Sequence, residues 1–179
     1  MEEHKKSVAS HASKYGSILG GILVAFYLLL YIVNVNLKSP AFMIDYLFFI
    51  GVLFFVIKSY RDITGGYITY GRALSVGALI SIFTSIIILF FKFIYLKFID
   101  LEAIDKLFTY MQENWAAQNI DEDRINQMTE MMQKVKGPVF MAFSYAIETI
   151  FKGVIFSLII SIFLKKQDKS FEGTFNNEI

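Results

Sequence analysis

The sequence has 179 residues, of which 55% are hydrophobic, 17% aromatic and 18% charged, and its formal net charge is +1. Because soluble domains average about 25% charged residues and at most about 50% apolar ones, this composition is typical of a lipid-facing protein. With no Cys and two His, the chain excludes a disulfide scaffold, a Cys/His zinc site and a thiol nucleophile. The near-neutral charge gives no reason to expect a nucleic-acid partner.

The first apolar stretch follows a charged N-terminal arm, residues 1–14. No charged side chain occurs between Lys14 and Lys38, and one crossing takes about 20 apolar residues. We therefore predict a first membrane span over residues 15–35. A cleaved signal peptide is the alternative, but the apolar run exceeds the usual length and Ser39-Pro40-Ala41 is a poor cleavage site.

Three further apolar stretches predict three further spans, over residues 41–57, 73–96 and 138–164. The second run carries Asp45 near its start, which we expect at the membrane interface. Short linkers join the first three spans and predict antiparallel neighbours. The predicted fold is all-α, a four-transmembrane-helix bundle over residues 15–166.

Lys and Arg gather on one side of these spans. They are Lys5, Lys6, Lys14, Lys58, Arg61, Arg72, Lys165, Lys166 and Lys169. The opposite side carries Lys38 and a net acidic segment between spans three and four. The positive-inside rule then predicts a multi-pass protein with both termini, including the tail 167–179, in the cytoplasm.

The acidic segment, residues 98–137, has two apolar stripes at alternating steps of three and four, which predict two helices. The stripes are Leu101, Ile104, Phe108, Met111 and Trp115, then Ile125, Met128, Met132 and Val135. Asp121 can cap the second helix, which we expect to end at Gly137-Pro138.

We expect the first of these helices to continue span three without a break, because no Gly or Pro occurs between Ser81 and Asn119. The second would return antiparallel to it, giving an extracytoplasmic helical hairpin that projects from the membrane. The alternative lays both helices flat on the lipid surface. Surface-lying helices usually carry Lys and Arg on the polar face, so the acidic composition favours projection.

Small residues recur at steps of four in three spans, a pattern that lets helix backbones approach closely in lipid. The ridges are Ser13, Ser17, Gly21 and Ala25; Ala73, Gly77, Ser81 and Ser85; and Thr149, Gly153, Ser157 and Ser161. We interpret all three as packing faces used within one chain.

Glu148, Lys152 and Lys92 form a candidate intramembrane polar cluster. Glu148 lies roughly 15 Å into the fourth span, where an unpaired charge costs several kcal/mol. Lys152 follows at the i,i+4 spacing that favours a pair, and Lys92 can lean toward Glu148 or snorkel outward. One hypothesis is an ion or proton path; the other is a buried pair that specifies helix register.

A candidate cytoplasmic loop motif follows span two. Its residues are Tyr60, Arg61, Asp62, Gly65, Gly66, Tyr70 and Gly71. Gly65-Gly66 predicts a tight reversal, and the tyrosines suit a membrane-interface belt better than partner recognition. His4 and His11 are expected to be solvated. The chain has neither a phosphate-cradling loop nor a nucleophile elbow.

With this motif, and with Lys14-Tyr15-Gly16 at the entry to span one, the sequence resembles the bacterial membrane family called domain of unknown function 4199. The resemblance extends over residues 14–166. The family often has Pro after an Ile-Asp at the end of span three, where this chain has Ile99-Asp100-Leu101. The resemblance implies a bacterial inner-membrane protein and supplies no catalytic residue.

Three classes of function remain. We expect a non-enzymatic interaction, assembly or accessory protein that lies in the lipid bilayer and contacts a protein partner or a second copy through the outer hairpin. The alternative is a small oligomeric transporter or channel that uses Glu148 and Lys152. No catalytic constellation converges on one side of the membrane, so we expect no enzyme and no cofactor or metal.

Overall fold

The computed structural model describes residues 8–36 and 39–166, and these residues are predominantly helical. The elements are α1 (Val8–Ile32), the 3-10 helix η1 (Pro40–Met43), α2 (Ile44–Ile63), α3 (Tyr70–Ile94), the π-helix η2 (Tyr95–Ile99), α4 (Ala103–Ala117), α5 (Glu122–Lys134) and α6 (Pro138–Leu164). The predictions for His4, Lys5, Lys6, Lys38, Lys169 and the tail 167–179 lie outside the described residues.

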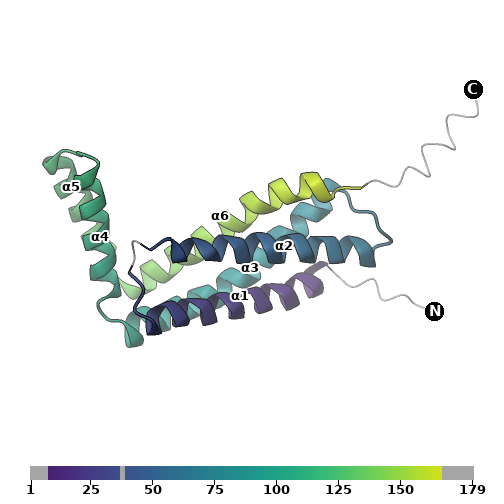
Figure 1. Cartoon of the computed structure of the whole chain (residues 1–179), viewed down its shortest axis with the longest axis horizontal. Coiled ribbons are helices and arrows are strands. Elements are labelled where there is room, and N and C mark those ends of the chain that lie inside the picture. Colours follow the sequence, from purple (N-terminus) through teal and green to yellow (C-terminus); the bar gives the residue numbers. More distant parts are fainter. Residues whose placement is uncertain (1–7, 37–38, 167–179) are drawn as a thin grey trace, which may run out of the picture.

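Four helical segments are long and apolar enough to cross a membrane: Val8–Ile32, Pro40–Ile63, Tyr70–Ile99 and Pro138–Leu164. Figure 1 shows α1, α2, α3 and α6 lying along one common direction as a bundle. Helix α3 contacts each of the other three. The predicted all-α class is therefore confirmed, and each of the four predicted spans corresponds to a helix of membrane-crossing length.

The helices extend beyond the apolar runs from which the spans were predicted. Helix α1 begins at Val8 and includes Lys14, a residue that the sequence assigns to the N-terminal arm. Helix α2 continues to Ile63, so Lys58 and Arg61 lie in its last turns. A charged side chain can extend its apolar stem along the bundle and leave its head in water, so the end of an apolar run does not end the helix.

The seam between α3 and α6 uses two of the predicted small-residue ridges. Gly77, Ser81, Gly153 and Ser157 are all buried there. A Cβ added at Gly77 would lie 2.7 Å from the Ser157 Cβ, and one added at Gly153 would lie 2.5 Å from the Ser81 Cβ. Each glycine therefore faces a serine of the other helix, and the packing of these ridges within one chain is confirmed.

The ridge predicted on α1 is wrong. Ser17, Gly21 and Ala25 are exposed, whereas Gly16 and Gly20 face α3. A Cβ added at Gly16 would lie 2.8 Å from the Ile80 carbonyl oxygen. The Thr84 hydroxyl also donates a 3.0 Å hydrogen bond to the Gly16 carbonyl. Helix α1 therefore has two faces with small residues at steps of four, and the face with Gly16 and Gly20 is the one that packs against α3.

The prediction that span three continues unbroken into the next helix is also wrong. The π-helix ends at Ile99, and Asp100 has φ −125° and ψ 88°, outside the helical region. Its carboxylate accepts hydrogen bonds from the Tyr95 hydroxyl at 3.2 Å and from Lys106 at 3.3 Å. Local side-chain hydrogen bonds of this kind stabilise a turn in place of a helix, so neither Gly nor Pro is needed for the break.

Helices α4 and α5 together form the arm, which runs across one end of the bundle instead of prolonging α3 (Figure 1). Gln112 on α4 donates a 3.0 Å hydrogen bond to Thr129 on α5, and Lys136 pairs with Asp105. Asp121 caps α5 as predicted, accepting from the Asp123 N–H at 2.9 Å. The helix ends at Lys134, before the predicted Gly137-Pro138.

The root of the arm packs on the bundle through a small apolar cluster. Ile104 and Phe108 are buried against Leu96, with Met132, Met141 and Tyr145 beside them. The remaining stripe residues are less well covered, and Leu101 is 72% exposed. The arm is therefore anchored at its base and open to its surroundings along the rest of its length.

Candidate functional site

A buried ion pair joins α2 to α6. The Lys152 Nζ lies 2.6 Å from Asp45 Oδ2, and the two side chains are 8% and 6% exposed. The Tyr27 hydroxyl donates a 3.0 Å hydrogen bond to the same carboxylate oxygen. Asp45 thus brings α1, α2 and α6 together at one point.

The pair gives Asp45, predicted from the sequence as an interfacial residue, a buried partner that the prediction did not include. Helix α6 begins beside the arm, beyond the level at which α2 begins (Figure 1). A residue well along α6, Lys152, therefore lies level with the first turn of α2. A carboxylate in an otherwise uncharged apolar run was the sequence signal that could have identified it, since such a group needs a partner.

Glu148 is the weaker partner of Lys152. The Lys152 Nζ lies 3.8 Å from Glu148 Oε1, and the Glu148 side chain is 56% exposed. The structure thus brings the two residues together at the predicted spacing, but the short contact belongs to Asp45.

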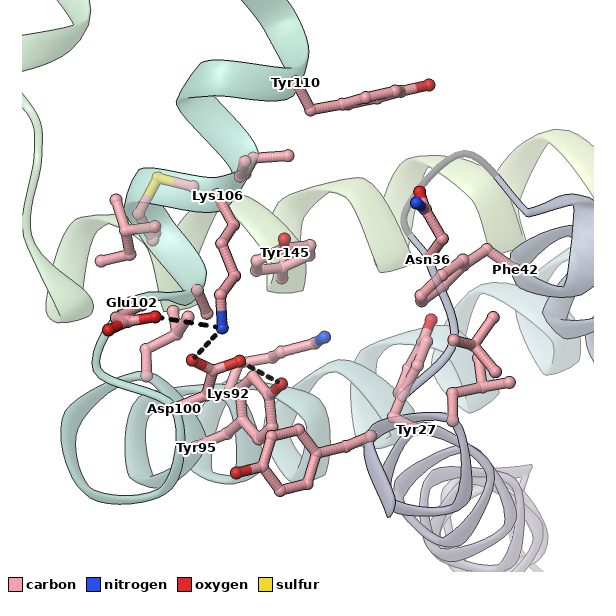
Figure 2. A pocket seen from close by; sticks show the side chains of 18 of the residues that line it. Tyr27, Asn36, Phe42, Lys92, Tyr95, Asp100, Glu102, Lys106, Tyr110 and Tyr145 are labelled. Carbon is pink, nitrogen blue, oxygen red and sulfur yellow. Dashed lines mark hydrogen bonds and ion pairs between the residues drawn. The ribbon is translucent and has the colours of Figure 1, made fainter. Parts of the chain in front are cut away.

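Lys92 lies among aromatic rings. Its Nζ is 4.2 Å from the centroid of the Tyr27 ring and 4.4 Å from that of Tyr145, distances at which an ammonium is attracted to the face of a ring. Figure 2 shows the side chain extending between these two tyrosines. The ion pairs among the described residues do not include Lys92, so it does not reach Glu148 as an ion pair.

Apart from Lys152, these side chains line a pocket of about 1140 Å³ between the end of the bundle and the arm. Asp45, Lys92 and Glu148 belong to its wall on the bundle side, while Glu102 and Lys106 belong to the arm side. Lys106 pairs with Asp100 at 3.3 Å and with Glu102 at 3.5 Å, contacts that Figure 2 also shows. The hydrogen bond to Asp100 raises the pKa of Lys106, because it favours the charged form of the amine.

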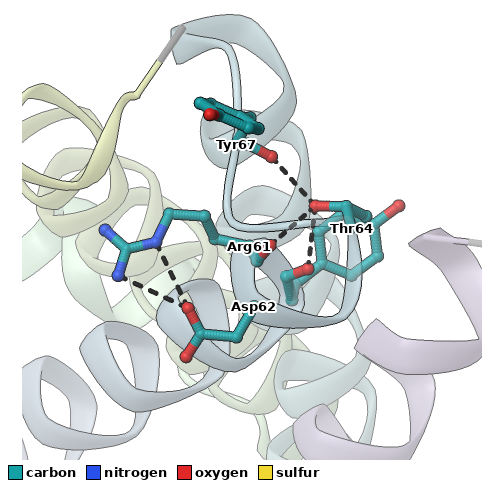
Figure 3. A network of polar contacts seen from close by, with 5 residues as sticks. Arg61, Asp62, Thr64 and Tyr67 are labelled. Atoms are coloured by element: carbon teal, nitrogen blue, oxygen red, sulfur yellow. Dashed lines mark hydrogen bonds and ion pairs between the residues drawn. The ribbon is translucent and has the colours of Figure 1, made fainter. Parts of the chain in front are cut away.

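The residues of the candidate loop motif lie at the opposite end of the bundle and serve to shape the chain there. Thr64 is the centre: its hydroxyl lies 3.0 Å from the Arg61 carbonyl and 2.9 Å from the Tyr67 carbonyl (Figure 3). Gly65 and Gly66 have φ +86° and +85°, a conformation that side-chain-bearing residues rarely adopt. The predicted reversal at these glycines is confirmed.

Tyr60 does not belong to an interface belt, because it is 1% exposed. Arg72 donates a 3.1 Å hydrogen bond to its hydroxyl, and the His11 ring lies 5.3 Å from its ring. His11 is itself buried, at 5% exposed, so the prediction of a solvated histidine is wrong there. Both corrections have one cause: α1 already begins at Val8, so His11 is part of this helix and its ring lies against Tyr60 near the end of α2.

The rest of the motif is more open. Arg61 pairs with the neighbouring Asp62 at 3.4 Å (Figure 3). Tyr70 is 37% exposed at the start of α3, and a Cβ added at Gly71 would meet open space. The contacts among the residues of the motif, such as the Gly66 N–H to the Arg61 carbonyl at 2.9 Å, shape the turn itself, and the pocket at the other end of the bundle is the better candidate.

Comparison with known proteins identifies one family. The family described as "Protein of unknown function (DUF4199)" matches residues 14–166, most of the chain. No curated protein matches the sequence, and no solved structure matches it. The match covers most of the first membrane-length helix, all of the other three and both walls of the pocket, and the chain therefore belongs to the DUF4199 family of proteins of unknown function.

Proposed function

We propose that the protein is a non-enzymatic accessory protein of the bacterial inner membrane, with both termini in the cytoplasm and the arm outside as its contact surface. The observation that carries the proposal is the arm. It runs across the bundle end (Figure 1) and exposes apolar as well as acidic side chains, with Met131 69% exposed on α5 and Val135, directly after α5, 36% exposed. Exposed apolar residues rimmed by polar ones mark interaction surfaces.

The distribution of charge supports this orientation. The end of the bundle that holds the start of α1, the α2–α3 loop and the end of α6 carries Lys14, Arg72 and Lys166. The arm at the other end is acidic in its α5 first turn, with Glu122 and Asp123. Positive-inside topology then directs the arm outward. With the spans along the bilayer normal, the arm follows the membrane surface, the alternative to the projecting hairpin.

The native mass of the full chain, gently extracted from its host membrane, tests the proposal. We expect a stoichiometric companion, either another protein or a second copy, that is lost in Met131→Arg because a charge then enters the apolar part of the contact. Asn126→Arg is the matched control, since Asn126 is exposed on the same helix. A monomer without any companion would overturn the proposal, as would equal loss in both variants.

Transport through an oligomer is a second candidate, and four ionisable side chains within the spans favour it. Asp45, Lys92, Glu148 and Lys152 would line or approach a path. In that case Glu148→Gln should abolish dye-reported ion or proton flux into liposomes while the protein stays folded. Unchanged flux in this variant removes the candidate.

A further inference from the structure

The wall of the pocket between the bundle and the arm holds two cationic side chains, Lys92 and Lys106, six carboxylates, and a larger number of apolar and aromatic side chains. Its volume of about 1140 Å³ is that of a site for a sizeable ligand, since ligand pockets measure about 300–1,000 Å³. Phe91, Leu96 and Met141 are among its apolar lining residues, and Lys92 is on the same wall. A ligand bound in this pocket is independent of any protein that binds the arm.

The charges within the spans show which group is available to a ligand. Asp45 holds Lys152 at 2.6 Å, and Glu148 faces Lys152 at 3.8 Å. Lys92 is surrounded by ring faces, with Tyr27 and Tyr145 the nearest. A cation held by rings keeps its donors for an anion, and such a bond is strong in a medium of low dielectric constant.

The acidic residues of the arm wall do not compete for Lys92. Asp100 and Glu102 pair with Lys106, and Asp105 pairs with Lys136. Glu113 adds a further carboxylate on the arm side. Asp45 and Glu148 on the bundle wall face Lys152, so the negative end of a ligand is favoured at the Lys92 ammonium itself and disfavoured against the arm.

We propose that this pocket binds an anionic amphiphile, with a phosphate or carboxylate at Lys92 and a hydrocarbon chain against Phe91, Leu96 and Met141. The shared chemistry is one anionic head on an apolar body. A membrane phospholipid and a free fatty acid both supply it, and the experiment separates them.

The test is native mass spectrometry of the purified full chain in a mild detergent, titrated separately with phosphatidylglycerol, oleate, phosphatidylcholine and inorganic phosphate. We expect one molecule of phosphatidylglycerol or oleate to bind, and the stronger of the two identifies the source. Lys92→Met should weaken that binding by about tenfold or more, because a charged hydrogen bond is lost. Lys92→Arg should retain it.

Lys97→Met is the matched control, since Lys97 is on the π-helix that continues α3, is exposed, and is not part of the pocket wall. Equal weakening in Lys92→Met and Lys97→Met would show general surface attraction and overturn the proposal. Binding that Lys92→Met leaves unchanged, equal binding of phosphatidylcholine, or binding of inorganic phosphate alone would overturn it as well.

A second variant covers the case in which Lys92→Met does not fold. Ala103→Trp fills the pocket from the arm side, where Ala103 is a lining residue, and changes no charge. It should also lower binding of the amphiphile, and full binding in a folded Ala103→Trp protein contradicts the proposal. Because purified protein is used alone, the result does not depend on whether the arm has a protein partner.

Discussion

Replacing Asp45 by Asn is expected to destabilise the protein by about 3–5 kcal/mol, the cost of removing one partner from a buried ion pair. The variant leaves the Lys152 ammonium, 8% exposed and previously 2.6 Å from a carboxylate, with Glu148 at 3.8 Å as its carboxylate partner. Lys152→Met should cost a similar amount, because the buried Asp45 carboxylate then keeps only the Tyr27 hydroxyl. The free energy of unfolding can be measured by titration with sodium dodecyl sulfate, followed by circular dichroism.

The double variant Asp45→Asn, Lys152→Met distinguishes the interaction energy of the pair from the effects of the two single substitutions. It leaves no buried charge unpaired at this point, since Glu148 is 56% exposed, and it retains an acceptor for Tyr27, so it should be within about 1 kcal/mol of the original protein. Glu148→Gln is the control, with an expected loss below about 1 kcal/mol, because the Glu148 carboxylate is 56% exposed. Additive losses in the double variant would show that the two residues do not act as a unit.

Gly153→Ala is expected to destabilise the seam between α3 and α6 by about 1–3 kcal/mol, as overpacking does in a close-packed interior. The added Cβ would lie 2.5 Å from the Ser81 Cβ and 3.1 Å from the Phe49 ring, so one of the helices must shift. Gly51→Ala is the matched control, since a Cβ there meets nothing within 4 Å. The same detergent titration measures both variants.

A compensating change sharpens this prediction. Ser81→Gly removes the side chain that the new methyl group would meet, and the pair Gly153→Ala, Ser81→Gly should recover most of the lost stability. Coupled residues in contact show interaction energies of about 0.5–3 kcal/mol. If Gly153→Ala and Gly51→Ala were equally stable, the seam would be looser than the structure describes.

The sequence predicted which ionisable residues belong to the site, but not which residues they pair with. Glu148 and Lys152 were found because a charge in an apolar run is conspicuous at any depth. Their spacing on one helix suggested a pair, and the contact exists at 3.8 Å. The closer partner, Asp45, is distant in sequence, and the depth at which α2 begins relative to α6 sets that pairing.

The aromatic contacts of Lys92 could not be predicted from the sequence either. Tyr27 and Tyr145 lie on different helices, and nothing in their local sequence distinguishes them from lipid-facing tyrosines. They surround Lys92 because α1, α3 and α6 meet at the pocket. The same reason explains Tyr60 and His11, which are buried against each other from α2 and α1.

The sequence by itself determined the all-helical class, the four spans and the reversal at Gly65-Gly66, because these follow from apolar length, helix-breaking residues and backbone permissiveness, which are local properties. Only the tertiary structure decided the face of α1 that packs, the turn at Asp100 that directs the arm across the bundle, and the joining of Asp45 to Lys152. Each depends on how far one helix is shifted or turned against another. That shift is set by packing over the whole bundle, and short sequence windows do not contain it.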